Sequence, residues 1–203
     1  MRTRSIRSAA LVAAFALAIP ATAAAQIVDP DAVTAREAEY SPYLGYNYPD
    51  RVFFGDTHLH TSFSTDAGMV GNVLGPDEAY RFAKGEIVTS SAGVRARLLR
   101  PLDWLVVADH AENLGLATLI AESDSELLKN DWGREVHDMV KDGRPWDAYA
   151  AWGEQMTARD DPLAGSEALT RTMWERLTEA AEIHNEPGRF TAFIGYEWTS
   201  SPG

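Results

Sequence analysis

Three short apolar runs constrain the fold of this chain most strongly, because each is β-prone and each ends in polar residues. They are RVFF at 51–54, the run within PLDWLVVADH at 101–110, and the run within RFTAFIGYEW at 189–198. Consecutive apolar residues, as in 105–108, are typical of parallel strands that are covered on both faces. Segment 111–187 lies between the second and third runs and carries helical patterns. We therefore predict an α/β fold with three parallel strands and a helical insertion.

Three further elements can be predicted from local signals. The segment 75–86 has Pro76 near its start and Gly85 near its end, the order expected for a short helix. Segment 86–99 has β-prone flanks around Ser-Ala-Gly and predicts a surface hairpin. The clearest helix lies within 165–188 and ends at Asn185. Its apolar face is expected to contain Leu169, Met173, Leu177, Ala180 and His184.

The first 25 residues have the order of a secretory signal peptide. Three arginines at positions 2, 4 and 7 precede an apolar run, and small residues follow, with a cut expected between Ala25 and Gln26. The run is too short for a permanent membrane span, although an uncleaved anchor is the alternative. We expect a periplasmic or secreted protein that has no membrane association after cleavage.

The remaining chain divides into two parts. Residues 26–50 carry prolines and tyrosines without a clear period, and we expect an extended segment there. Residues 51–203 form the main domain. A closed (β/α) barrel needs roughly 250 residues, and only three strands are predicted here. We therefore expect 51–203 to be the N-terminal part of a longer, truncated domain.

Composition excludes some classes of function. The formal net charge is −12, and removing residues 1–25 takes away three arginines and no acids, which leaves −15. An acidic protein is a poor match for nucleic acid, which requires clustered Lys and Arg. The chain has no cysteine, so a metal site would consist of histidine and carboxylate ligands. Oligomeric state has no signal in the sequence.

The polar residues at the ends of the apolar runs form the candidate site. They are Asp56, His58 and His60 after the first run, Asp109, His110 and Glu112 after the second, and Glu197 after the third. The carboxyl ends of parallel strands share one edge, where active sites lie. Side chains two apart on a strand face the same side, so His-x-His can bind one divalent ion. Asp56 could bind metal or orient a histidine ring.

More ordinary explanations exist for some of these residues. His-x-His alone is a weak signal and also fits a polar turn after a strand, but the other two strand ends favour a metal site. His137 lies in a polar helix, and we expect it to be solvated. His184 continues an apolar helix face, and we expect it to be packed rather than to bind metal. Trp198, beside Glu197, could line a pocket.

These residues resemble three ordered motifs of the polymerase-and-histidinol-phosphatase (PHP) superfamily of metal-dependent hydrolases. DTHLHTSFSTDAG matches its first motif, ADH its second with Ala108 in place of threonine, and GYE its third. Within the superfamily, the chain is similar to a large bacterial family of exported proteins catalogued as a domain of unknown function.

The resemblance implies a fold, a cofactor and a set of site residues. The fold would be a distorted (β/α)7 barrel, with two or three Zn, Mn or Fe ions. His58 and His60 would bind one ion, Glu197 would bridge two, and Asp66 and His110 would hold a neighbouring ion. Asp109 and His110 are the candidate catalytic residues, with Asp109 and Asp56 supporting the ligands.

The function expected from the resemblance is hydrolysis of a phosphoester or other small-molecule substrate by metal-activated water. Two alternatives stay open. An amidohydrolase-type barrel also begins with His-x-His but needs a bridging lysine from a later strand. A truncated, non-catalytic metal-binding protein is the other.

Overall fold

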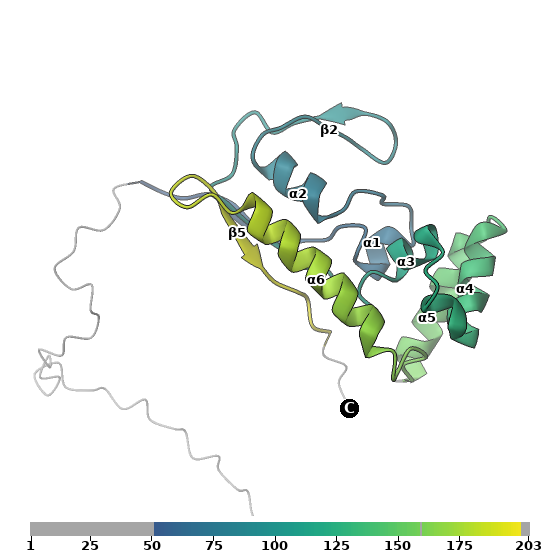
Figure 1. Ribbon diagram of the computed structural model, residues 1–203. Helices are drawn as coiled ribbons and strands as arrows, with labels where there is room; N and C mark the ends of the chain where they lie inside the picture. The colour runs from purple at the N-terminus through teal and green to yellow at the C-terminus, as the bar shows by residue number, and fades with distance from the viewer. Residues whose placement is uncertain (1–50, 159, 200–203) are drawn as a thin grey trace, which may run out of the picture. The chain divides into compact units, whose positions relative to one another are not determined.

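Three parallel strands in the order β1-β4-β5 form the sheet on which the rest of the described chain is arranged (Figure 1). The computed structural model describes residues 51–158 and 160–199. The strands are β1 Gly55–Leu59, β4 Trp104–Val107 and β5 Thr191–Ile194, with a two-stranded hairpin of β2 Val88–Thr89 and β3 Arg95–Ala96. The helices are α1 Thr65–Gly68, α2 Pro76–Ala83, α3 Leu116–Glu122, the 3₁₀ helix η2 Leu127–Lys129, α4 Asp131–Lys141, α5 Pro145–Ala158 and α6 Glu167–His184.

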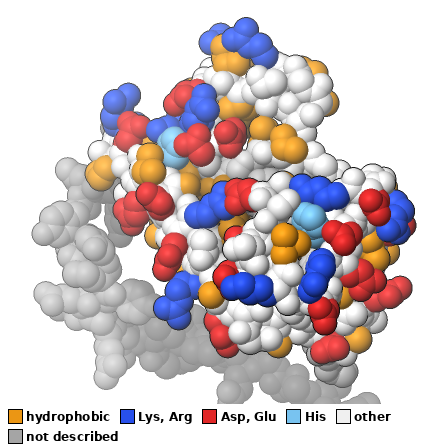
Figure 2. All heavy atoms as spheres, turned by 45° about the vertical axis from the view of Figure 1, so that its right-hand side comes forward, with side chains coloured by type: hydrophobic (Ala, Val, Ile, Leu, Met, Phe, Trp, Pro, Cys, Tyr) orange, Lys and Arg blue, Asp and Glu red, His pale blue; other side chains and the backbone are white. Residues whose placement is uncertain are grey.

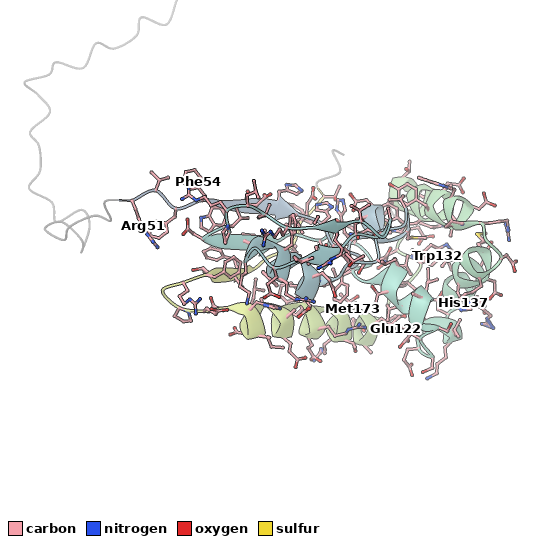
Figure 3. The ribbon with its side chains drawn as sticks, turned by 90° about the horizontal axis from the view of Figure 1, so that it is seen from above. Arg51, Phe54, Glu122, Trp132, His137 and Met173 are labelled. Atoms are coloured by element: carbon pink, nitrogen blue, oxygen red, sulfur yellow. The ribbon has the colours of Figure 1, made fainter. Side chains whose placement is uncertain are left out.

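The expected α/β class and the three parallel strands are confirmed. The two crossovers place α2 between β1 and β4 in the chain and α6 between β4 and β5. The helices α2 and α6 pack on each other and against β4 and β5, respectively. Figure 3, seen from above, shows α6 lying along one side of the strands. Leu105 and Val107 of β4 point to this helical side and are completely buried.

The first strand begins later than the sequence suggested. We expected a strand at 51–54, but β1 is Gly55–Leu59, and Phe53 and Phe54 are about half exposed. Their rings are covered by guanidinium groups, Arg51 over Phe53 and Arg100 over Phe54, so the apolar run does not need a sheet to cover it. The strand begins at a glycine because the Trp104 ring leaves no space for a Cβ there.

The predicted short helix and hairpin are confirmed as α2 and as the β2–β3 pair. Gly75 caps α2, and its N–H donates to Glu78 Oε2 at 3.0 Å. Gly85, just past the helix, has φ +81°, which is the conformation expected of a glycine that ends a helix. The strands β4 and β5 are shorter than the runs that predicted them.

The helical insertion is confirmed and supplies most of the core. In α6 the buried residues are Leu169, Met173, Leu177, Ala181 and His184, so Ala181 occupies the place that we assigned to Ala180. Arg176 of α6 forms two hydrogen bonds with Glu122 of α3, both about 3 Å long; Glu122 and Met173 are labelled in Figure 3. In the part of the chain that is described, no helix combines the length and the apolar character needed to cross a membrane.

The outer face of the helical region carries charges of both signs. Figure 2 shows acidic and basic side chains interspersed on this face. Several are paired within one turn of helix, such as Arg134 with Asp131 and Arg144 with Asp147. Exposed pairs of this kind contribute about 0.2–1 kcal/mol each. Most of the stability is therefore expected from the buried apolar core, to which α6 and the sheet both contribute.

Two apolar residues on α6 test this conclusion. Leu177 is fully buried, whereas Ile183 is 67% exposed. We expect Leu177→Ala to lower the free energy of unfolding by about 2–5 kcal/mol, because it leaves a cavity in the core. Ile183→Ala is the matched control and should change it by less than about 0.5 kcal/mol. Urea denaturation followed by circular dichroism measures both, and similar losses would contradict the assigned packing.

Candidate metal centre

The sheet brings the candidate residues of all three strands to one edge. His58 lies in β1, and His60 is the first residue after this strand, on the same face as His58. His110 and Glu197 continue beyond β4 and β5 and pair there in an isolated parallel bridge. The Glu197 N–H donates to the Asp109 carbonyl at 2.9 Å, and the Ala111 N–H donates to the Glu197 carbonyl at 2.9 Å. This pairing fixes Glu197 beside His110.

Gly195 allows β5 to reach this position. A Cβ at residue 195 would collide with Cγ1 of Val106 on the neighbouring strand. Any larger residue would push the end of β5 away from β4. The glycine of the GYE motif thus permits the close approach that places Glu197 at the site.

Three potential ligand atoms converge at the centre of the site. His58 Nε2 and His60 Nε2 are 2.9 Å apart, and Glu197 Oε2 lies 2.9 Å from the first and 2.8 Å from the second. In a neutral histidine one ring nitrogen is an acceptor, and an ionised carboxylate is acceptor-only. Such atoms repel unless protons or a cation lie between them. The triangle is therefore suited to a cation.

The other nitrogen of His60 faces a carboxylate. His60 Nδ1 lies 3.0 and 3.1 Å from the two oxygens of Asp66, so it is the Nδ1–H that donates to Asp66. This hydrogen bond turns Nε2 toward His58 and Glu197. A carboxylate that fixes the ring of a ligating histidine in this way is common at metal sites.

The charges of the site shift the pKa values of its members. Burial lowers the pKa of His60, but the hydrogen bond and charge of Asp66 and the charge of Glu197 raise it more, so the net shift is upward. Burial raises the pKa of Asp66, yet the hydrogen bonds from Ser64 and His60 bring it below its ordinary value. The pKa of Glu197 is also lowered: burial opposes the shift, and the His58 hydrogen bond and the histidine charges outweigh it. The two carboxylates are thus ionised near neutral pH.

His110, Asp66 and His60 form a second group of residues that could hold a metal ion. Its Nε2 lies 3.5 Å from Asp66 Oδ2 and 3.8 Å from Glu197 Oε2. Its Nδ1 lies 3.2 Å from the Thr199 hydroxyl. The structure thus brings together all five residues that we predicted as metal ligands, His58, His60, Asp66, His110 and Glu197.

Asp109 and Asp56 lie outside this constellation. Asp109 is fully buried: Thr61 donates its N–H to one carboxylate oxygen and its hydroxyl, at 2.7 Å, to the other. Burial raises the pKa of Asp109, and these two hydrogen bonds oppose that shift. This placement suits a positioning residue better than a catalytic one. Asp56 accepts the backbone N–H of His58 at 2.9 Å, and that local contact does not involve a histidine ring.

One important residue, Ser64, was missed by the sequence analysis. It is completely buried and directly precedes the short helix α1, which was not predicted either. Its hydroxyl lies within 3.2 Å of His60, Asp66 and the His110 backbone. The sequence signal that could have identified Ser64 is its place in STDAG, two residues before the candidate ligand Asp66.

His137 is less exposed than we expected, because its side chain is only 13% exposed. His137 Nε2 lies 3.0 Å from the Ser123 hydroxyl, and Nδ1 lies 2.8 Å from Asp138. This order matches a Ser-His-Asp triad, but Asp138 is 64% exposed. The N–H groups of Ser123 and Asp124 are used by α3 carbonyls, so they cannot stabilise an oxyanion. We interpret the contacts as a link between α3 and α4.

The expectation for His184 is confirmed, because its side chain is buried between α6 and α2. It is 6% exposed, its ring lies 5.5 Å from the Tyr80 ring in a tilted arrangement, and its Nε2 lies 2.8 Å from Asp77 Oδ1. Trp198 is 74% exposed.

Comparisons with known proteins place the chain in one family. A family model described as "Protein of unknown function (DUF3604)" matches residues 47–203. No curated protein and no solved structure matches the chain.

The role of Asp109 can be tested by stability. Asp109→Ala leaves the buried N–H and hydroxyl of Thr61 without acceptors, and we expect the free energy of unfolding to fall by about 1–3 kcal/mol. Asp56→Ala, an exposed carboxylate with one local hydrogen bond, is the control and should change it by less than about 0.5 kcal/mol. Denaturation is measured in chelator, so that metal binding does not contribute. Wild-type stability in Asp109→Ala would exclude the positioning role.

Proposed function

The chain belongs to the DUF3604 family, whose function is unknown, and we propose that it is a metal-dependent hydrolase that acts on phosphoesters. The observation that carries the proposal is the triangle of His58 Nε2, His60 Nε2 and Glu197 Oε2, with every side 2.8–2.9 Å. The order of the three motifs, which resembles that of the PHP superfamily, supports it.

The residues fit a divalent metal ion. Two histidines and one glutamate are a ligand set used at catalytic zinc sites, which keep a fourth position open for water. Tetrahedral ligands about 2.0–2.1 Å from zinc lie roughly 3.3 Å from one another, so the triangle would have to expand by only about 0.4 Å. His58 is 60% exposed at its side chain, which leaves the site open to solvent.

A second ion fits beside the first. His110 Nε2 lies 3.5 Å from Asp66 Oδ2 and 3.8 Å from Glu197 Oε2. Glu197 would then bridge the two ions. The ligand types suit Zn, Mn and Fe alike.

Bound ions would supply hydroxide at neutral pH and neutralise the charge that develops on phosphate oxygens. The protein's own residues prepare for this chemistry in three ways. Asp66 holds the proton on His60 Nδ1, which keeps the Nε2 lone pair available. Glu197 is ionised near neutral pH, as glutamates ordinarily are; burial raises its pKa, but the His58 hydrogen bond and the histidine charges outweigh burial and keep the pKa below its ordinary value. Asp109 fixes the position of Thr61, the residue after His60, so that the histidine does not move during the reaction.

The same proposal extends to the fold and to location. The order of strand, helix and strand in β1, β4 and β5, which are parallel, is compatible with part of a distorted (β/α)7 barrel, in which the site would lie at the carboxyl ends of the strands. The N-terminal pattern, which lies outside the described residues, supports export. A small-molecule phosphoester outside the cytoplasm is the substrate that we propose.

Metal content and activity test the proposed function. The protein, purified without chelator, should contain at least one equivalent of Zn, Mn or Fe by elemental analysis and should hydrolyse 4-nitrophenyl phosphate. His58→Ala combined with His60→Ala should lose the metal and reduce kcat/KM by more than about 100-fold. Mutating a residue that only hydrogen-bonds to a ligand already lowers metal affinity or activity about 10–100-fold. His137→Ala is the control, a histidine distant from the site that should keep both properties. Full activity in the double variant would refute the proposal.

Export has its own test. Expressed in a bacterium with its N-terminus intact, the protein should be recovered from the periplasm or medium with Gln26 as its first residue, as read by intact mass and N-terminal sequencing. An Ala25→Phe variant should be cleaved poorly, because small residues are required at the cut. Recovery of the uncut chain in the cytoplasm would contradict export.

A further inference from the structure

Ser64 is not a candidate ligand, yet its hydroxyl is in hydrogen-bond contact with three residues that are, His60, Asp66 and His110. Its Oγ lies 2.6 Å from Asp66 Oδ1 and 3.2 Å from His60 Nδ1, and it accepts the backbone N–H of His110 at 3.2 Å. Ser64 is completely buried. The hydroxyl is thus shielded from solvent, although the Asp66 side chain that it contacts is 36% exposed.

The three contacts use the full hydrogen-bonding capacity of a hydroxyl. A serine hydroxyl has one proton to donate and two lone pairs to accept. The short contact to the Asp66 carboxylate takes the proton, since an ionised carboxylate can only accept. The lone pairs then accept from His110 N–H and from His60 Nδ1–H, which also faces Asp66. No other assignment satisfies all three partners.

We propose that Ser64 is a positioning residue for the metal centre: its hydroxyl fixes Asp66, His60 and the His110 backbone relative to one another. This inference rests on the proposed metal site. Without the hydroxyl, Asp66 would lose a hydrogen bond that holds its carboxylate against His60, and His110 N–H would lose its acceptor. The ligands would remain present but would no longer be held in one arrangement, and metal affinity would fall.

Ser62 offers a matched control. It is also a buried serine, two residues earlier in the same segment. In the described part of the chain, the hydrogen bonds from a serine hydroxyl to Asp66, His60 and the His110 N–H are made by Ser64 and not by Ser62. Ser62→Ala removes the same atom from a similar environment. A difference between the two alanine variants therefore reports the contacts of Ser64 and not the loss of a buried hydroxyl in general.

The experiment measures Zn²⁺ affinity of the chain by competition with a chromophoric chelator. We expect Ser64→Ala to bind Zn²⁺ about 10–100-fold more weakly than wild type, the usual loss for partners of ligands. Ser62→Ala should stay within twofold. Asp66→Asn combined with Ser64→Ala should lose less affinity than the two single losses added together, because part of the effect of the hydroxyl passes through Asp66. Wild-type affinity in Ser64→Ala, or additive losses in the combined variant, would overturn the proposal.

A second measurement is made without metal. Exchange of the His110 amide hydrogen, followed by NMR, should be faster in Ser64→Ala than in wild type and unchanged in Ser62→Ala. Unchanged exchange in Ser64→Ala would overturn the inference while leaving the metal-dependent hydrolase standing. A wild-type chain that binds no Zn²⁺ would refute the proposed function and this inference together. An unfolded Ser64→Ala variant would show that the hydroxyl holds the fold instead and would also overturn the inference.

Discussion

The candidate metal centre depends on the pairing of Thr61 with the buried carboxylate of Asp109. Thr61 is the residue after His60, and Asp109 is the residue before His110. The pair thus ties the segment that leaves β1 to the segment that leaves β4, with the backbone N–H and the hydroxyl of Thr61 both donating to one carboxylate. A buried carboxylate is tolerated only when its hydrogen bonds are made. The same contacts therefore satisfy the aspartate and set the distance between two histidines.

Glu197 reaches the site by a different means. Its side chain comes from β5, whose approach is set by backbone pairing with Asp109 and by the absence of a side chain at Gly195. Asp109 thus contacts the segment after β1 through its side chain and the segment after β5 through its carbonyl. Ser64 adds a third connection, from the loop before α1 to both Asp66 and the backbone of His110. Residues that are not candidate ligands carry all three connections.

Much of this arrangement could be predicted from the sequence, because it follows from local periodicity. The alternation of side chains along a strand placed His58 and His60 on one face, and the edge shared by parallel strands placed His110 and Glu197 beside them. The apolar face of α6 and the hairpin were likewise evident from residue patterns. These features depend on short segments and on general rules of sheet geometry.

Other features depended on tertiary contacts that no local pattern shows. Residues 51–54 have strand propensity, yet arginines cover their rings and the strand begins at Gly55. The position of Asp109 at a strand end predicts an active-site acid, and no local pattern shows that Thr61 donates two hydrogen bonds to its carboxylate. The helix that carries Asp66 has four residues, too few for a periodic signal. His137 lies in a polar segment but is shielded by Ser123, which comes from a different helix end.

The sequence separation within the triangle has a consequence for folding. His58 and Glu197 are 139 residues apart in the chain, and their ligand atoms meet only after both crossovers are complete and β5 has docked on β4. An ion that needs all three ligands cannot bind partly folded chains with the same affinity. Ion binding would therefore favour the completed sheet over its folding intermediates, by about 2.7 kcal/mol when the free ion is at 100 times its Kd. Ion binding at the candidate centre would then stabilise only chains that have completed the last step of folding, the docking of β5.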